Sequence, residues 1–252
     1  MNFFNDIGYI LANYWKDFLY GVAWTLVISL VATLIGLLLG LIIGIIRTIP
    51  YSKNKFVFAC QKVLNFFLSA YIEVFRGTPM MVQAIVIFWG YAFASGGVTL
   101  PLIPSAIVIV SINTGAYIAE IVRGGIIGID KGQFEAAHAL GMNHFQTMVH
   151  IVLPQVMKTI LPAVSNEFVI NIKDTSVLNV IGVTELYFMM AMTVKQTAKN
   201  FPVYFVGCVI YFILTFTITR IIKLIEKKIQ GKQHYSLYSS NAIGDLIEEG
   251  GN

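Results

Sequence analysis

Apolar residues gather in long stretches along this chain, and polar residues separate the stretches. The first, Phe18 to Ile46, holds 29 residues without a charge, and as a helix it would be about 43 Å long. That exceeds the ~30 Å hydrocarbon core of a bilayer, so we predict a first membrane span here. Gly36, Gly40 and Gly44 recur at every fourth position and would share one helical face. They either admit a closely packed helix or are merely tolerated in lipid.

Four later stretches predict further spans: Met80 to Ala94, Ser105 to Ile129, His150 to Ile172 and Phe201 to Thr219. The segment Phe56 to Pro79 is also apolar, but it is interrupted by Gln61, Lys62, Asn65, Glu73 and Arg76. Because such groups would be costly inside a bilayer, we expect an amphipathic elbow helix near the cytoplasmic face. The segment Asp174 to Asn200 is mixed in character, and a re-entrant half-helix around Val177 to Leu186 is one interpretation of it.

Two groups of basic residues orient the spans. One follows the first span and contains Arg47, Lys53, Lys55 and Lys62; the other follows the last and contains Arg220, Lys223, Lys227, Lys228 and Lys232. Cytoplasmic connections of membrane proteins are enriched in lysine and arginine. Five crossings, with the N-terminus outside and the C-terminus inside, place both groups in the cytoplasm. A sixth span at Phe56 to Tyr71 would separate them, so the sequence predicts an all-α integral membrane fold with about five transmembrane helices.

The overall composition fits this class of protein. Hydrophobic residues make up 57% and charged residues 12% of the 252 positions, and the mean hydropathy is +0.75. A soluble domain carries about 25% charged residues. The formal net charge of +4 gives no indication of nucleic acid binding. Cys60 and Cys208 lie in apolar stretches without metal-ligand spacing, which predicts two buried thiols rather than a disulfide or a metal site.

One long polar segment, Gly132 to Pro154, interrupts the apolar pattern. Glu135 to Leu140 contains good helix formers, and Gly141 can take the positive φ that ends a helix. Asn143 can cap a second short helix, and Pro154 fits the first turn of the span that follows. The segment therefore predicts a helix, a glycine break and a second helix on the cytoplasmic side.

Seven positions of this segment form a spaced pattern: Glu135, Ala136, Ala137, Gly141, Ile151, Leu153 and Pro154. They resemble the EAA motif of ABC importer permeases, EAA-x3-G-x9-I-x-LP, at every defined position. Further islands are similar to the polar amino acid branch of that family: YIEVFRGTP at 71–79, AYIAE and RGGI within 116–126, GQ at 132–133 and KDTS at 173–176. The resemblance covers roughly residues 20 to 223.

This resemblance implies a type I ABC transmembrane domain over residues 20–223, with its coupling loop at 132–154. Residues 1–19 would be an extracytoplasmic leader and residues 224–252 a cytoplasmic tail. Such a chain is a multi-pass permease of the bacterial plasma membrane that imports an amino acid. It pairs with a second permease copy, identical or different, with two ATPase subunits and with an extracytoplasmic solute-binding protein.

The same resemblance assigns coupling to the ATPase to four residues: Glu135, Ala136, Ala137 and Gly141. ATP and magnesium would be bound by the ATPase subunit. The chain contains no G-x4-G-K-[ST] loop, so we expect it neither to hydrolyse ATP nor to bind a cofactor by itself.

Two carboxylates in the fourth predicted span are candidates for the transport path. Glu167 lies nine residues after Lys158, about 13 Å along a helix, which places it near mid-membrane. An ionisable group at that depth is costly unless it faces a cavity or a partner. Asp174 follows seven residues later on nearly the same face, so the pair would suit an ammonium group or a cationic side chain. Alternatively, Glu167 could pair with Lys173 or Arg123, and Asp174 could cap the next segment.

Other polar residues are weaker candidates for the substrate path: Asn166, Thr175, Ser176 and Arg76. Arg76 could bind a substrate carboxylate, anchor to a lipid phosphate or cap a helix. Glu120 and Arg123 stand three residues apart and predict an intrahelical ion pair. Three histidines recur every six residues, which fits neither one helical face nor a metal site, and we expect them at the loop surface: His138, His144 and His150.

A secondary transporter or channel is the main alternative function, because it would also be hydrophobic with a buried carboxylate. Such a protein would have no reason to carry the spaced loop motif. An intramembrane enzyme would need a nucleophile or paired histidine and aspartate in its spans, and the sequence shows no such set. We therefore expect a transporter subunit rather than an enzyme, and among substrates a polar amino acid, with a cationic one slightly favoured.

Overall fold

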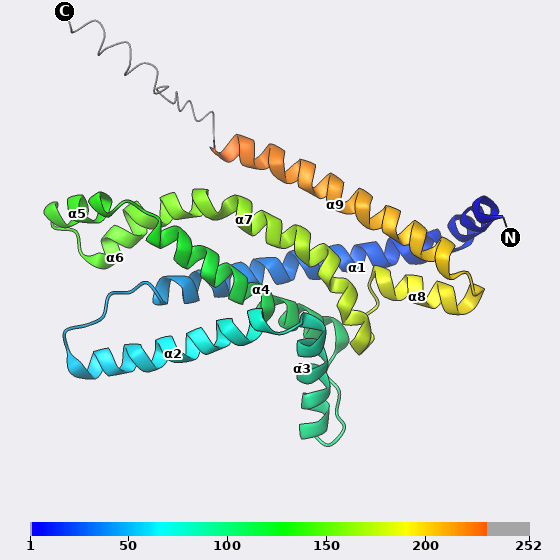
Figure 1. Ribbon diagram of the computed structural model, residues 1–252, viewed down its shortest axis with the longest axis horizontal. Coiled ribbons are helices and arrows are strands. Elements are labelled where there is room, and N and C mark those ends of the chain that lie inside the picture. Colours follow the sequence, from blue (N-terminus) through cyan, green and yellow to red (C-terminus); the bar gives the residue numbers. More distant parts are fainter. Residues whose placement is uncertain (1, 231–252) are drawn as a thin grey trace, which may run out of the picture.

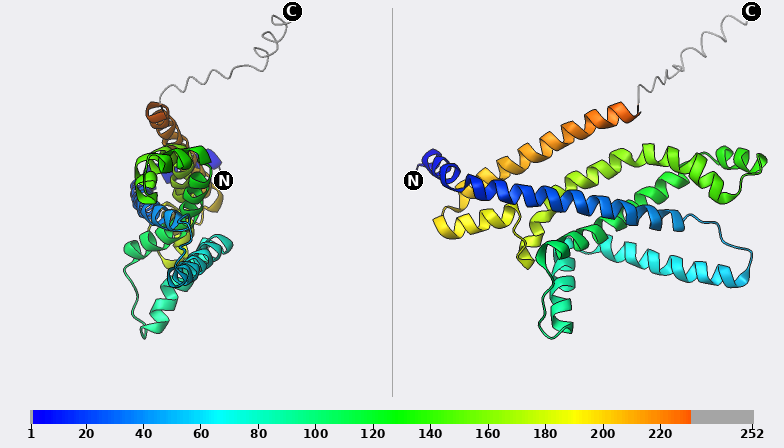
Figure 2. Two further views of the ribbon diagram at one scale, coloured as in Figure 1. Left: turned by 90° about the vertical axis from the view of Figure 1, so that its left-hand side faces the viewer. Right: turned by 180° about the vertical axis from the view of Figure 1, so that it is seen from behind.

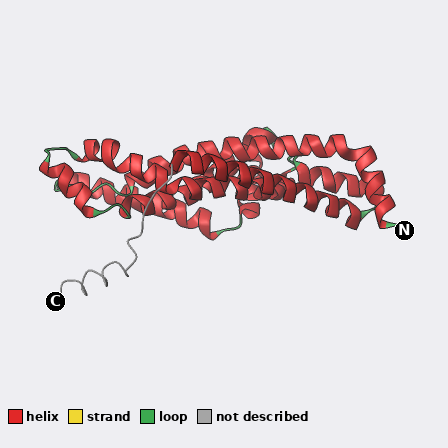
Figure 3. Cartoon of the chain, turned by 90° about the horizontal axis from the view of Figure 1, so that it is seen from above, coloured by secondary structure: helices red, strands yellow, loops and turns green. Residues whose placement is uncertain are grey.

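The computed structural model describes residues 2–230, in which every regular element is helical and short loops join the helices (Figure 3). The α-helices are α1 Phe3–Ile46, α2 Lys55–Gly77, α3 Met80–Ala94, α4 Leu102–Ile127, α5 Lys131–Ala139, α6 His144–Thr147, α7 Leu153–Asp174, α8 Leu186–Thr197 and α9 Asn200–Gln230. A π-helix, Met148–Val152, precedes α7, and a 3-10 helix, Thr175–Ile181, follows it. The predicted all-α class is confirmed.

Five helical segments are long and apolar enough to cross a membrane. They are α1, α2, α4, the continuous segment His144–Ile181 that contains α7, and α9. All five run lengthwise in an elongated bundle, whereas the shorter α3 runs across it (Figure 1). The predicted number of spans is confirmed.

The identity of the second span is a correction. The elbow predicted at Phe56 to Pro79 is α2, a candidate span, and the span predicted at Met80 to Ala94 is the crosswise helix α3. The charged residues of α2 lie towards its two ends and leave residues 63–72 without a charge. Lys62 can extend its ammonium group towards the interface, so a count of charges overstated the cost of inserting this helix.

The ends of the five spans agree with the predicted orientation. The loop at residues 47–54, the α5–α6 hairpin and the last turns of α9 lie at one end of the bundle, and the start of α1 and α8 lie at the other (Figures 1 and 2). The basic residues Arg47, Lys53 and Lys223 belong to the first group. The positive-inside rule makes that end cytoplasmic, with the N-terminus outside and the C-terminal end of α9 inside.

The glycine stripe of α1 is a packing surface, which confirms one of the two interpretations of its spacing. Gly36, Gly40 and Gly44 are buried against α4. A Cβ atom placed on Gly40 would lie 2.6 Å from the Cβ of Ile118 and 2.9 Å from the backbone nitrogen of Ala119. The two helices therefore approach so closely that no side chain fits between them.

Two predicted domain boundaries, after residue 19 and after residue 223, fall within helices, the first in α1 and the second in α9. Because α1 begins at Phe3, most of the leader at residues 1–19 continues the first span, and Asp6 forms an ion pair with Lys199 of the α8–α9 loop. The extracytoplasmic location of this segment stays a prediction. Most of the tail predicted at residues 224–252 lies outside the described residues; its first part, to Gln230, is helical and belongs to α9.

The segment after α7 differs from the re-entrant half-helix considered for Val177 to Leu186. It is a 3-10 helix that ends at Gly182, whose φ of +89° turns the chain towards α8. Leu178 and Ile181 are buried in a hydrophobic cluster with residues of α1, α3 and α4. Glu185 is fully buried and accepts hydrogen bonds from the first backbone amides of α8, which fixes the start of that helix.

A cysteine-labelling experiment tests the orientation. The native Cys60 and Cys208 are exposed on α2 and α9, which overturns the prediction that they are buried, so both must first be replaced. In intact cells, a membrane-impermeant maleimide should label Thr99→Cys, in the α3–α4 loop, and leave Ser52→Cys, in the α1–α2 loop, unlabelled. Permeabilised cells should label both, and labelling of Ser52→Cys in intact cells would contradict the five-span topology.

Candidate functional site

A pocket of about 300 Å³ lies where the α2–α3 junction meets α4 and α7. Its lining includes both predicted carboxylates and is otherwise mostly polar: Thr78, Pro79, Met80, Asn113, Tyr117, Glu167, Ile170, Asn171 and Asp174. Three of these residues come from the α2–α3 junction, two from α4 and four from α7. Segments far apart in the sequence thus form one pocket, which is open to the surface of the single chain.

The regular geometry of α7 brings the two carboxylates into this pocket. Residues four and seven apart on an α-helix lie on nearly the same face, so Glu167, Asn171 and Asp174 form one stripe. Glu167 and Asp174 are both half-buried. The structure therefore brings Glu167 and Asp174 together, as the spacing predicts, although their contact with a substrate stays a prediction.

Neither carboxylate of the pocket forms an ion pair with a basic residue of the described chain. The three ion pairs among residues 2–230 leave out Glu167 and Asp174. Arg123 pairs with Glu120 rather than Glu167, and the side chain of Asp174 makes no capping hydrogen bond to the 3-10 helix that follows. The alternative roles for these carboxylates, an ion pair for Glu167 and a helix cap for Asp174, therefore do not occur in the described chain.

The other predicted path residues have different surroundings. Asn166 lies on another face of α7, in a groove shared with α9, and Ser176 lines a separate hollow with Tyr187 and Tyr211. Thr175 is fully buried, and its hydroxyl donates to the backbone oxygen of Ile172 at 3.0 Å. In the single chain, none of these three residues lines the pocket of Glu167 and Asp174.

Arg76 is at the edge of the same site. It occupies the last turn of α2, and its guanidinium lies 5.3 Å from the ring centroid of Tyr117, which lines the pocket. This distance allows a cation–π interaction that keeps Arg76 beside the pocket mouth. The arginine is exposed, so its donor groups remain accessible.

A buried amide network supports the side of the pocket formed by α2 and α3, and sequence reasoning missed it. The Nδ2 of Asn113 donates to the Oε1 of Gln83 at 2.9 Å and to the backbone oxygen of Phe75 at 3.2 Å. Gln83 in turn donates to the backbone oxygen of Thr78 at 2.9 Å. These bonds satisfy carbonyl groups freed where α2 ends and join that break to α4. The sequence did offer one signal for this network, because Gln83 and Asn113 are isolated polar residues in apolar stretches.

The polar segment Gly132 to Pro154 folds as predicted. Asp130 caps α5, and Gly141 ends it with φ of +76°, while the amides of Gly141 and Met142 donate to the carbonyls of His138 and Ala137. This is the Schellman arrangement that favours glycine.

The second half of the segment and its surface also match the prediction. Asn143 and Gln146 form a reciprocal capping box on α6, and Pro154 lies in the first turn of α7. Leu140 and Phe145 are 81% and 73% exposed at the tip of the hairpin. Of the three histidines, His138 and His150 are exposed and His144 is partly exposed.

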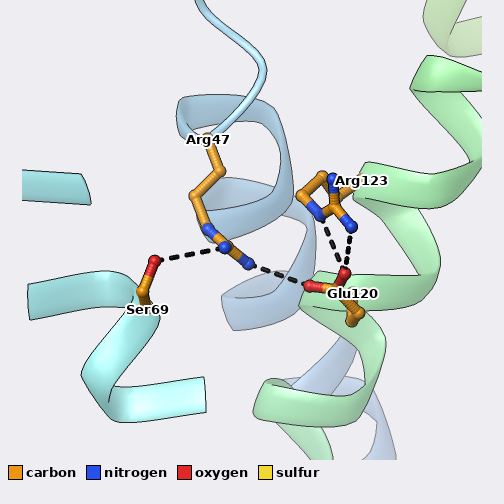
Figure 4. Close-up of polar contacts among 4 residues, drawn as sticks. All are labelled: Arg47, Ser69, Glu120 and Arg123. Carbon is orange, nitrogen blue, oxygen red and sulfur yellow. Dashed lines mark hydrogen bonds and ion pairs between the residues drawn. The ribbon is translucent and has the colours of Figure 1, made fainter. Parts of the chain in front are cut away.

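The predicted ion pair of Glu120 and Arg123 is present and belongs to a larger cluster (Figure 4). The Nη1 of Arg47, at the end of α1, lies 2.9 Å from the Oε2 of Glu120, and its Nη2 donates to the Oγ of Ser69 in α2 at 3.2 Å. One carboxylate thus holds two guanidinium groups and joins the cytoplasmic parts of α1, α2 and α4.

Comparison with known proteins agrees with this arrangement. The model of the family described as binding-protein-dependent transport system inner membrane component matches residues 56–231. The L-cystine transport system permease protein TcyB of Bacillus subtilis is 37% identical over 168 residues, which cover 66% of this chain and 70% of TcyB. The glutamine transport system permease protein GlnP of Escherichia coli is 34% identical, over 67% of this chain and 77% of GlnP.

Solved structures extend the similarity to the fold. The crystal structure of an amino acid ABC transporter with histidines superposes with a TM-score of 0.76 and 33% identity, covering 90% of this chain and 99% of that one. An inward-facing MetNI methionine ABC transporter superposes with a TM-score of 0.68 at 20% identity, over 84% of this chain and 95% of its own, which supports the fold alone. This chain is a membrane protein that belongs to the family of binding-protein-dependent transport system inner membrane components.

Proposed function

We propose that this chain is the permease subunit of an ATP-driven importer for a polar amino acid in a bacterial plasma membrane. Its family membership and its similarity to cystine and glutamine permeases support the assignment. Two permease copies assemble with two ATPase subunits, and a solute-binding protein delivers the amino acid from outside. ATP and magnesium are bound by the ATPase, so this chain itself is not an enzyme and binds no cofactor.

The pocket of Glu167 and Asp174 is the observation that carries the substrate assignment. Two carboxylates that form no ion pair within the described chain suit the α-ammonium group that every amino acid carries. Tyr117 lines the same pocket and Arg76 lies over its ring, so the guanidinium of Arg76 offers donors for the α-carboxylate. The site therefore favours a zwitterion, and a second cationic group on the substrate would be accommodated by the second carboxylate.

Asn166, Thr175 and Ser176 remain candidates for the wider path. Asn166 and Ser176 line other hollows of the monomer, and a second permease copy could make these hollows continuous with the pocket. Thr175 would act on the path only indirectly, because its side chain is buried.

The α5–α6 hairpin is the proposed contact with the ATPase. Glu135, Ala136 and Gly141 are exposed on it, while Ala137 is buried and holds α5 in place. A shallow hollow of about 350 Å³ lies where the loop after α5 meets α6 and the π-helix, and it is lined by Leu140, Gly141, Met142, Gln146 and His150. Exposed apolar side chains beside such a hollow suit docking to another protein.

Replacing one carboxylate tests the proposal. The importer, assembled in proteoliposomes with its ATPase and binding protein, is supplied with radiolabelled L-glutamine, L-cystine, L-histidine, L-lysine or L-arginine. Glu167→Gln keeps the shape and hydrogen bonding of the side chain but removes its charge. We expect uptake of the preferred amino acid to fall at least tenfold, which corresponds to roughly 1.4 kcal/mol.

Glu73→Gln is the matched control, because Glu73 is exposed on α2 and does not line the pocket. It should transport at the wild-type rate. Wild-type uptake by Glu167→Gln would remove Glu167 from the substrate path. Uptake that continues without the ATPase would instead favour a secondary transporter or channel.

A further inference from the structure

One pocket residue, Asn171, is also part of a buried triad that joins three spans. Its Nδ2 donates to the Oγ1 of Thr33 in α1 at 2.8 Å and to the Oγ1 of Thr114 in α4 at 3.0 Å. The three side chains are only 3%, 5% and 1% exposed, for Asn171, Thr33 and Thr114 respectively. In a membrane interior no water replaces such bonds, so breaking them leaves polar groups unpaired.

The direction of these bonds is determined by α1. The hydroxyl of Thr33 donates to the backbone oxygen of Ser29 at 2.7 Å, so its proton is used and its oxygen is left as an acceptor. The NH2 group of Asn171 must therefore face Thr33. The Oδ1 of the same amide accepts from the hydroxyl of Thr114 at 3.2 Å, which holds its other side.

This triad acts on the part of α7 that carries the pocket carboxylates. Asn171 lies four residues after Glu167 and three before Asp174, on the same face of α7. A rotation of α7 large enough to break the bond to Thr33 would turn both carboxylates relative to α4. Pro162, inside α7, removes one backbone hydrogen bond of the helix just before this region. The second half of α7 therefore depends on tertiary contacts for its orientation.

We propose that Thr33, although outside the pocket, is a positioning residue for the substrate site. Its hydroxyl sets the rotation of α7 through Asn171 and so aims Glu167 and Asp174 into the pocket. This inference rests on the proposed function, in which those two carboxylates bind the substrate.

Direct binding to the permease–ATPase complex in lipid nanodiscs tests the inference, because uptake also depends on the binding protein. The probe is the radiolabelled amino acid that the wild-type importer takes up fastest among the five named above. Thr33→Val is isosteric and lacks the hydroxyl, and it should raise the Kd about fivefold, roughly 1 kcal/mol. Thr33→Ser retains the hydroxyl and should restore the wild-type Kd. Thr33→Val should lower the melting temperature, because it leaves a buried donor of Asn171 without its acceptor, whereas Thr33→Ser should keep it near wild type. The ATPase rate without amino acid should change little in either variant.

Thr25→Val is the matched control on the same face of α1. Thr25 is fully buried and its hydroxyl accepts from the backbone amide of Leu186, at the start of α8, so it should leave the Kd unchanged. An equal rise in Thr25→Val would assign the effect to general packing of α1 and would overturn the inference.

A second variant separates failure of this inference from failure of the proposed function. Thr114→Val breaks the same triad from α4 and should weaken binding in the same way, even if Thr33→Val does not fold. Wild-type Kd values in the folded triad variants, together with weak binding by Glu167→Gln, would overturn only the role of the triad. A wild-type Kd in Glu167→Gln would overturn the substrate assignment itself.

Discussion

Replacing Gly40 with leucine is expected to prevent the bundle from forming, at a cost of about 3 kcal/mol or more in folding free energy. The reason is the contact of α1 with α4, where even a Cβ atom on Gly40 would lie 2.6 Å from the side chain of Ile118 and 2.9 Å from the backbone of Ala119. A flexible side chain could move aside, but a helix backbone cannot do so without separating the two helices. The yield of monodisperse protein in detergent and its melting temperature measure the effect.

Gly90→Leu provides the control for that experiment. Gly90 also lies inside a helix, α3, and a Cβ atom there would meet no other atom within 4 Å. The same substitution should leave the yield and the melting temperature near wild type, because leucine favours the helix and finds free space. A wild-type melting temperature in Gly40→Leu would show that α1 and α4 do not pack as described.

The second large effect is expected at Gly141, where valine should impair both the substrate stimulation of ATP hydrolysis and transport. Gly141 has φ of +76°, and a β-branched residue adopts this conformation only at a cost of roughly 1–3 kcal/mol. The α5–α6 hairpin would change its shape rather than store that strain. Under the proposed function this hairpin contacts the ATPase, so substrate-stimulated hydrolysis and uptake should both fall by roughly tenfold, while the permease still inserts into the membrane.

Gly141→Asn separates backbone conformation from side-chain size. Asparagine adopts positive φ more readily than other non-glycine residues, and nothing lies within 4 Å of a Cβ atom at this position. This variant should therefore retain most of the coupling that Gly141→Val loses. Full coupling in Gly141→Val would contradict the assignment of this hairpin to the ATPase contact.

Features that depend on neighbouring residues could be predicted from the sequence. The caps at Asn143 and Gly141 lie within a few residues of the backbone groups they satisfy, so the helix–break–helix of the coupling segment followed from local chemistry. The same holds for the stripe of Glu167 and Asp174, because one helical period relates them. The glycine stripe of α1 and the placing of basic residues at one end of the bundle were also readable from spacing alone.

Contacts between distant segments were decided only by the tertiary structure. Asn113 and Tyr117 share a pocket with Glu167 because α4 packs beside α7, and Glu120 binds Arg47, which lies 73 residues away in the chain. By contrast, Asn166 is next to Glu167 in sequence and faces a different groove, because adjacent residues on a helix point about 100° apart.

The choice between α2 and α3 as the second span shows the physical reason most clearly. Both segments are apolar, so composition alone favoured the less charged one, Met80–Ala94. The direction of a helix relative to the bundle is set by the helices it packs against and by where its charges lie along its axis, and α2 packs lengthwise against α4 whereas α3 runs across the bundle. Hydropathy determined that these residues belong in or at a membrane, and packing determined which of them cross it.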